Sequence, residues 1–95
     1  MSEILMTKKI REELDLRNLV VIAETIKAHE NEKDFDSFQV FKIKENYILN
    51  MQESPKRERK IQLKYTNKKD ETVWGIKEMD SIIGEYWTIL YQREY

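Results

Sequence analysis

The chain has 95 residues, of which 40% are hydrophobic, 37% are charged and none is cysteine. This length supports one hydrophobic core, so we predict a single domain over residues 1–95, and the 11% aromatic content argues against disorder. Without cysteine the sequence excludes disulfides, thiolate nucleophiles and cysteine-based zinc sites, and a cytoplasmic location fits best. No apolar run approaches the roughly 18 residues that span a bilayer, so we expect no membrane partner.

The first predicted element covers residues 4–10, ILMTKKI, as a short strand or an ordered arm. Beyond it, apolar residues recur at helical spacing and predict a helix over roughly 15–30, with Asp15 as its N-cap. These apolar positions are Leu16, Leu19, Val20, Ala23 and Ile26. The polar segment 29–36, HENEKDFD, is predicted to be the loop that leaves the helix.

Strand periodicity replaces helical periodicity after this loop. We predict strands over 38–43 and 47–52, joined by a turn at 44–46, and then a loop or strand edge at Pro55. The clearest half-buried strand is 60–65, with Ile61, Leu63 and Tyr65 on one face. A turn at 67–70 leads to a strand over 72–77, where Gly75 indicates a bulge or a close backbone approach. A loop at 78–85 precedes the last strand at 86–91.

These elements predict an α+β fold in which one amphipathic helix packs on an antiparallel sheet of about five strands. The simplest connection is a meander with the helix over one face. We expect four large aromatic residues to dominate the core: Phe38, Phe41, Trp74 and Trp87.

The sequence resembles a family of small bacterial proteins numbered 960 in the domain-of-unknown-function series. The resemblance depends on short motifs spread over most of the chain, at Gln39, Val40, Phe41, Gln52, Glu53, Trp74, Glu94 and Tyr95. Members of that family tend to have a compact Asp-Asp-Gly turn where this chain has EMDSIIGE. The resemblance implies an accessory protein of Gram-positive bacteria and their mobile elements, with no catalytic residues to transfer.

Groups for catalysis are scarce in the sequence. His29 is the only histidine and lies at the predicted helix end, where a cation is favourable. No serine lies in a GxSxG motif, and two glycines cannot form a phosphate-binding loop. Four acids between residues 30 and 36 could offer oxygen ligands to a cation, although a solvated loop explains them as well. We therefore predict no enzymatic activity, no cofactor and no metal.

The net charge of −1 is unevenly distributed along the chain. Residues 56–69 carry a net charge of +6, which could contact a nucleic-acid backbone through Lys56, Arg57, Arg59, Lys60, Lys64, Lys68 and Lys69. The same cations could instead keep an edge strand soluble. The net charge of −7 on the other residues favours this second explanation.

The aromatic residues near the C-terminus suggest a protein-binding surface instead. They cannot all face one core if the last strand alternates, so some are exposed or the sheet is covered on both faces. The candidates are Tyr86, Trp87, Tyr91 and Tyr95. We predict a protein-binding accessory or regulatory module, for example an inhibitor of a larger host machine, whose partner is another protein or a second copy of the chain. A sequence-independent nucleic-acid binder is the alternative.

Overall fold

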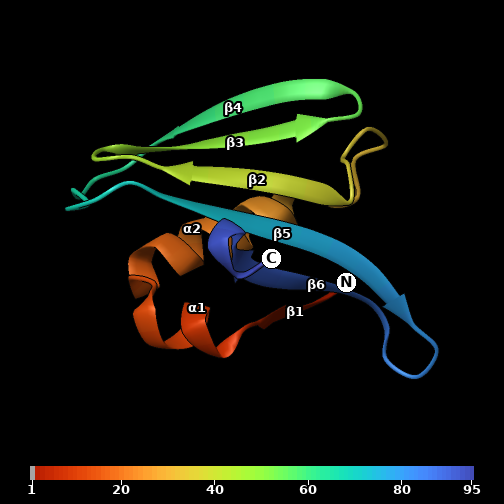
Figure 1. Ribbon diagram of the computed structural model, residues 1–95. Helices are drawn as coiled ribbons and strands as arrows, with labels where there is room; N and C mark the ends of the chain where they lie inside the picture. The colour runs from red at the N-terminus through yellow and green to blue at the C-terminus, as the bar shows by residue number, and fades with distance from the viewer. Residues whose placement is uncertain (1) are drawn as a thin grey trace.

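The computed structural model describes residues 2–95 as a six-stranded sheet with two helices packed on one of its faces (Figure 1). This confirms the predicted α+β class, with one more strand and one more helix than expected. In chain order the elements are β1 (Glu3–Met6), α1 (Lys8–Glu13), α2 (Leu16–His29), β2 (Phe38–Ile43), β3 (Tyr47–Glu53), β4 (Lys56–Gln62), β5 (Glu71–Asp80), β6 (Gly84–Tyr91) and the 3-10 turn η1 (Gln92–Glu94).

The strand order in the sheet is β1-β6-β5-β2-β3-β4. Only β1 runs parallel to its neighbour, β6, and all other pairs are antiparallel. The predicted meander is therefore wrong, because β5 pairs with β2 and leaves β4 at the edge. The order suits the residues: β4 begins KRERK, which an edge strand tolerates, whereas β5 brings Val73 and Trp74 into the middle of the sheet.

Helix α2 lies where the sequence predicted it, but its buried face differs from the predicted apolar stripe, because Leu16 and Val20 are 69% and 46% exposed while Ile22 and Ile26 are buried. Helix α2 starts at its N-cap Asp15, whose Oδ1 accepts a hydrogen bond from the Arg17 backbone N–H at 2.9 Å. Hydrogen bonds from Arg17 lower the pKa of Asp15. The short helix α1 was not predicted. Thr7 caps it by accepting a hydrogen bond from the Ile10 N–H at 3.2 Å.

Three strand boundaries differ from the predictions. The strand expected at 60–65 lies at 56–62, because charged β4 shows no apolar alternation for most of its length. Leu63 and Tyr65 fall in the following loop, where the Tyr65 hydroxyl donates to Asn18 Oδ1 at 2.7 Å. Strands β5 and β6 extend through most of the predicted loop 78–85 and leave a tight hairpin turn at 81–83.

The core lies between the helices and one face of the sheet, which we call the helix face. Phe41 from β2 and Trp87 from β6 are buried there, as predicted, together with Ile10 of α1 and Ile22 and Ile26 of α2. Gly75 marks a close approach, since a Cβ there would lie 3.3 Å from Ile26 Cδ1. The strand pairing runs through Gly75 without interruption, so there is no bulge.

A network of buried amide side chains ties the loop before β2 to the sheet. Gln39 Nε2 donates to Gln52 Oε1 at 2.8 Å, and Asn50 Nδ2 donates to Gln39 Oε1 at 3.0 Å. Gln52 Nε2 also donates to the backbone oxygens of Asp34 and Pro55. Gln39 and Gln52, two residues of the motifs noted above, therefore have a structural role in shaping this loop.

Candidate interaction surface

The sheet face away from the helices has an apolar centre, and we call it the open face. Strand alternation places on it Glu3 and Leu5 of β1, Tyr86, Thr88 and Leu90 of β6, Thr72, Trp74, Ile76 and Glu78 of β5, Phe38, Val40 and Lys42 of β2, Tyr47, Leu49, Met51 and Glu53 of β3, and Lys56, Glu58, Lys60 and Gln62 of β4. Neither α1 nor α2 covers this face (Figure 1). Its apolar side chains are only partly shielded by one another.

An aromatic cluster occupies the middle of the open face. The ring centroids of Phe38 and Trp74 lie 4.9 Å apart, and those of Trp74 and Tyr95 lie 5.2 Å apart. Phe38 is 37% exposed and Tyr95 is 84% exposed. Such amphipathic aromatic rings are enriched in protein interfaces, where they contribute much of the binding energy.

The turn η1 holds Tyr95 over this cluster. Glu94 Oε1 accepts hydrogen bonds from the Tyr91 backbone N–H at 2.9 Å and from the Thr7 hydroxyl at 2.9 Å. The last residues of the chain are thus fastened both to β6 and to the segment that follows β1. Tyr95 is placed on the open face by a fixed turn.

Two of the four aromatic residues predicted to bind protein lie in the core instead. Trp87 and Tyr91 are each 1% exposed and face the helices, so they are not available to a partner in this fold. Trp87 Nε1 donates to Glu30 Oε1 at 3.3 Å, whereas the buried Tyr91 hydroxyl has no hydrogen-bond partner among residues 2–95. Tyr86 does face away from the core, and Tyr95 is exposed as expected.

The sequence predictions assigned Phe38 and Trp74 to the core, where the structure does not place them. Trp74 lies one position after the buried Val73 on β5, and Phe38 lies three positions before the buried Phe41 on β2. Alternation could have separated the faces, because Val73 and Trp74 are adjacent and must point in opposite directions. The presence of apolar residues at successive positions of one strand was the signal that both faces of the sheet carry apolar side chains.

The basic segment is divided between the two faces of the edge strand and the loop that follows. Lys56 and Lys60 lie on the open face with Glu58 between them, while Arg57 points to the other face and its Nη1 lies 3.5 Å from Glu32 Oε1. Lys60 Nζ is 4.5 Å from the ring centroid of Tyr47. Arg59 shares the Arg57 face, and the remaining cations, Lys64, Lys68 and Lys69, belong to the loop. The segment does not present a continuous row of cations on one surface.

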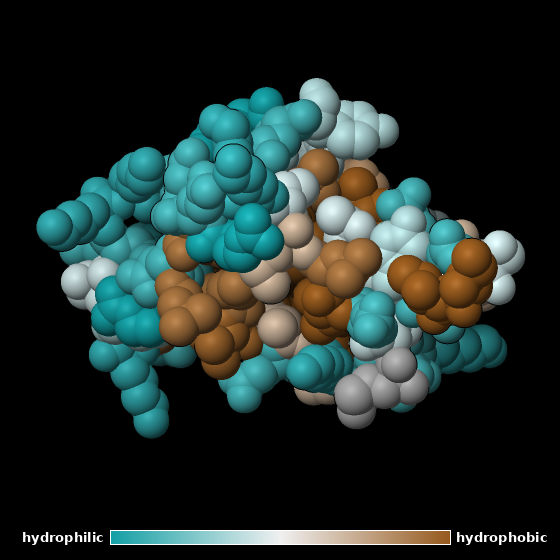
Figure 2. Space-filling view, turned by 90° about the horizontal axis from the view of Figure 1, so that it is seen from below, coloured by the Kyte–Doolittle hydropathy of each residue, from teal (hydrophilic) through white to brown (hydrophobic). Residues whose placement is uncertain are grey.

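The largest apolar exposure lies at the tip of the β5–β6 hairpin. Ile82 is 91% exposed, and Met79 and Ile83 are exposed beside it. Asp80 Oδ1 accepts hydrogen bonds from the backbone N–H groups of Ile82 and Ile83, and Gly84 closes the turn with a φ of 83°. From below, a group of hydrophobic side chains stands at the hairpin end, apart from the hydrophobic area in the middle (Figure 2).

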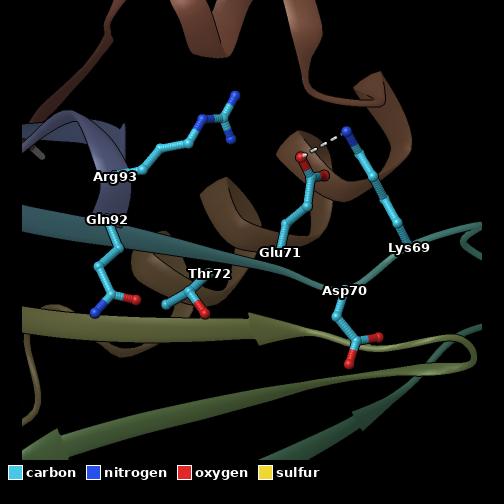
Figure 3. A pocket seen from close by; sticks show the side chains of 6 residues that line it. All are labelled: Lys69, Asp70, Glu71, Thr72, Gln92 and Arg93. Atoms are coloured by element: carbon cyan, nitrogen blue, oxygen red, sulfur yellow. Dashed lines mark ion pairs between the residues drawn. The ribbon is translucent and has the colours of Figure 1, made fainter.

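A hollow of about 270 Å³ lies where β5 begins, but its side chains do not converge (Figure 3). Arg93, Glu71 and Lys69 extend to one side of β5, whereas Gln92, Thr72 and Asp70 extend to the other. Lys69 Nζ lies 3.9 Å from Glu71 Oε1, and Arg93 Nη2 donates to Glu13 Oε1 at 2.7 Å. The charges are thus engaged in separate pairs, some with residues outside the hollow such as Glu13, and they do not surround a common point.

The acidic loop and His29 form local contacts. His29 Nδ1 at the end of α2 lies 2.6 Å from Glu32 Oε2, and this hydrogen bond lowers the pKa of Glu32. The loop backbone at Asp34 and Asp36 is hydrogen bonded to Gln52. Within residues 2–95 no three histidine or acidic side chains are grouped as metal ligands would be.

No family model, curated protein or solved structure matches this chain significantly. The resemblance to the bacterial family therefore stays a prediction. None of the helices in the described part of the chain is both long enough and apolar enough to cross a membrane.

Proposed function

We propose that this protein is a non-enzymatic binding module, with an accessory or regulatory role, that acts by docking its open face on another protein surface. The aromatic cluster of Phe38, Trp74 and Tyr95 on a sheet face without a helical cover is the observation that supports this proposal. An inhibitor that occupies a working surface of a larger machine is one form of such a module.

The packing of the two faces also supports docking. A sheet face that stays in water usually carries polar side chains. On the open face, however, β2 carries Phe38 and Val40, and β5 carries Trp74 and Ile76. Monomeric proteins rarely expose a continuous apolar area of several hundred square ångströms unless it binds something. Covering this area with a partner removes it from water, and this gain is absent from the isolated chain.

Site-specific photo-crosslinking tests the proposal. Tyr95 is replaced by a photo-reactive phenylalanine analogue, and the matched control carries the same analogue at Lys27, an exposed position of α2 on the opposite side of the sheet. After irradiation in cell lysate, we expect covalent protein adducts from position 95 and none from position 27. Equal adducts from both positions, or none from position 95, would overturn the proposal.

Nucleic acid is the second candidate partner, and the division of the basic segment between two faces does not favour it. A nuclease treatment before irradiation distinguishes a protein partner from a nucleic-acid partner. Adducts that survive the nuclease belong to a protein complex, whereas adducts that disappear with it indicate binding through a nucleic acid.

A further inference from the structure

The outer edge of β4 is open along its whole length. Strand β4 pairs with β3 through seven consecutive residues and is the outermost strand of the sheet, with no described element beyond it (Figure 1). It contains no proline, and its register with β3 has no bulge. The other edge strand, β1, is only four residues long. An unpaired strand edge offers its backbone N–H and C=O groups to another extended chain.

The hydrogen bonds of the ladder show which backbone groups of β4 point outward. The Lys44 N–H donates to the Tyr47 oxygen at 2.8 Å, so Tyr47 and every second residue of β3 after it bond to β2. The Leu63 N–H donates to the Asn46 oxygen at 3.0 Å, so the alternate residues of β3 bond to β4. The backbone groups that point away from β3 therefore belong to Lys56, Glu58, Lys60 and Gln62.

Positive side chains flank this edge on both faces of the sheet. Lys56 and Lys60 lie on the open face and are exposed, while Arg57 and Arg59 lie on the helix face and are half-buried. One acid, Glu58, reduces the four positive charges of β4 to a net charge of +3. Among residues 2–95, only Arg57 of these four cations forms an ion pair, with a carboxylate oxygen at 3.5 Å. The fold itself thus leaves most of this positive charge without an acidic partner.

We propose that an acidic segment of another protein binds this edge in extended form, as a seventh strand antiparallel to β4. Backbone hydrogen bonds with the outward groups supply affinity, and carboxylates opposite the four cations supply specificity. The inference goes beyond the proposed function, because it uses the edge of the sheet in place of the open face and names the chemistry of the partner.

The side chains of β4 define the sequence that fits. In the antiparallel direction, from Gln62 back to Lys56, the matching strand carries a polar residue, an apolar residue, two acids, one base and two acids. The apolar residue lies beside Ile61, and the base lies opposite Glu58. The peptide Thr-Val-Glu-Glu-Lys-Glu-Glu has this order. Opposite charges on neighbouring strands stabilise pairing, whereas like charges directly opposite one another destabilise it.

The same charges disfavour other occupants of the edge. Two β4 strands from two copies would set a net charge of +3 against +3, and repulsion opposes this pairing. Strand β1 of a second copy has one acid in its four residues, too few for four cations. A nucleic acid offers phosphates but no backbone N–H and C=O groups to complete a ladder. An acidic strand matches both the charge and the open backbone.

The backbone part of the proposal is tested with the labelled peptide and fluorescence anisotropy, in about 0.15 M salt to screen distant charges. We expect saturable binding to the full chain in the micromolar range. N-methylation of the peptide residues opposite Lys60 and Glu58 removes N–H groups that point at β4 and should weaken binding at least about tenfold. The matched control is N-methylated opposite Arg59 and Arg57, where the N–H groups point to solvent, and should bind as the unmodified peptide. Equal affinity of the two methylated peptides would overturn strand pairing.

The charge part is tested with variants of the protein. Lys60→Glu should weaken peptide binding about three- to tenfold, because it sets two carboxylates opposite one another. Lys68→Glu changes the net charge by the same amount in the exposed loop after β4 and should leave binding within about twofold. A peptide with lysine opposite position 60 should recover binding to Lys60→Glu. Circular dichroism confirms that both variants are folded, and equal losses in the two variants would overturn the register.

Failure of this inference is distinguishable from failure of the proposed function. A folded protein that does not bind the acidic peptide would overturn strand pairing at β4, whereas protein adducts from position 95 would still support docking through the open face. A single-stranded oligonucleotide that displaces the peptide and binds more tightly would assign the edge to nucleic acid and overturn the inference.

Discussion

The two faces of the sheet carry similar side chains and have different neighbours. On β2, Phe41 of the helix face is fully buried under α2, while Phe38, three residues earlier on the open face, is 37% exposed. The fold of the single chain requires only the first of these faces to be apolar. The aromatic content of the open face therefore needs an explanation outside the isolated fold, which the proposed interface supplies.

Removing the two β2 phenylalanines is the most direct test of this comparison. Phe41→Ala leaves a cavity in the core and should lower the free energy of unfolding by about 3–5 kcal/mol. Phe38→Ala, on the same strand, should lower the free energy of unfolding of the monomer by only about 1 kcal/mol, because the Phe38 side chain is already partly in water. Urea unfolding at low protein concentration measures both, and equal losses would contradict the distinction between the faces.

The amide network tests the polar part of the helix face. Gln39→Leu removes the acceptor of Asn50 Nδ2 and the donor to Gln52 Oε1, both buried. We expect a loss of about 1–3 kcal/mol, because buried polar groups keep their desolvation cost when a partner is removed. Lys42→Leu on the open side of β2 is the control and should change unfolding by about 0.5 kcal/mol or less. A neutral Gln39→Leu variant would show that the network does not stabilise the fold.

Removing the polar group of Tyr91, unlike that of Gln39, should not destabilise the fold. Its hydroxyl is buried without a hydrogen-bond partner, so Tyr91→Phe should be neutral or stabilising by about 1 kcal/mol. Burial, reinforced by the charge of Glu71, raises the pKa of Tyr91 to about 12. The folded state thus favours the protonated phenol, and this contribution to stability is complete below about pH 10 and lost as the pH rises toward 12. Thermal unfolding measured between about pH 10 and 12 should show that Tyr91→Phe loses less stability than the wild type as the pH rises, whereas Tyr95→Phe should behave as the wild type.

The smallest effect is expected at the hairpin tip. The backbone N–H groups of Ile82 and Ile83 donate to Asp80 and lower the pKa of its carboxylate. A lowered pKa in the folded state means that the turn is stabilised above the ordinary value of 3.8 and loses this support as the pH falls through the folded pKa. Asp80→Ala should speed amide hydrogen exchange at residues 82 and 83 only, with β2 amides as the internal control. Unchanged exchange there would contradict a capping role for Asp80.

The sequence was sufficient for the elements with a clear period. Helix α2 and strands β2, β3 and β6 follow from apolar spacing, and Asp15 marks a boundary by its chemistry. Helix α1 has one fully buried residue, Ile10, so its apolar period is too short to detect. Strand β4 pairs on one side only, and its charged residues show no core pattern.

The site was harder to predict than the fold. Alternation indicated that the four aromatic residues near the C-terminus could not all face one core, without showing which of them lie outside it, and the same argument was not applied to Trp74 and Phe38. Alternation could have assigned each residue to a face, but the sequence does not show the pairing order that sets Val40 of β2 beside Trp74 of β5. That contact joins residues far apart in sequence, and no local pattern encodes it.

The parallel pairing of β1 with β6 affects how the protein is made. The first strand has no neighbour other than the last one, and Thr7 is hydrogen bonded to Glu94 at the opposite end of the chain. During translation, therefore, β1 stays unpaired until β6 has left the ribosome, while the β2–β3–β4 hairpins can form earlier from neighbouring segments. A nascent chain stalled before β6 would expose both β1 and the edge of β5, which makes it a substrate for chaperones and proteases.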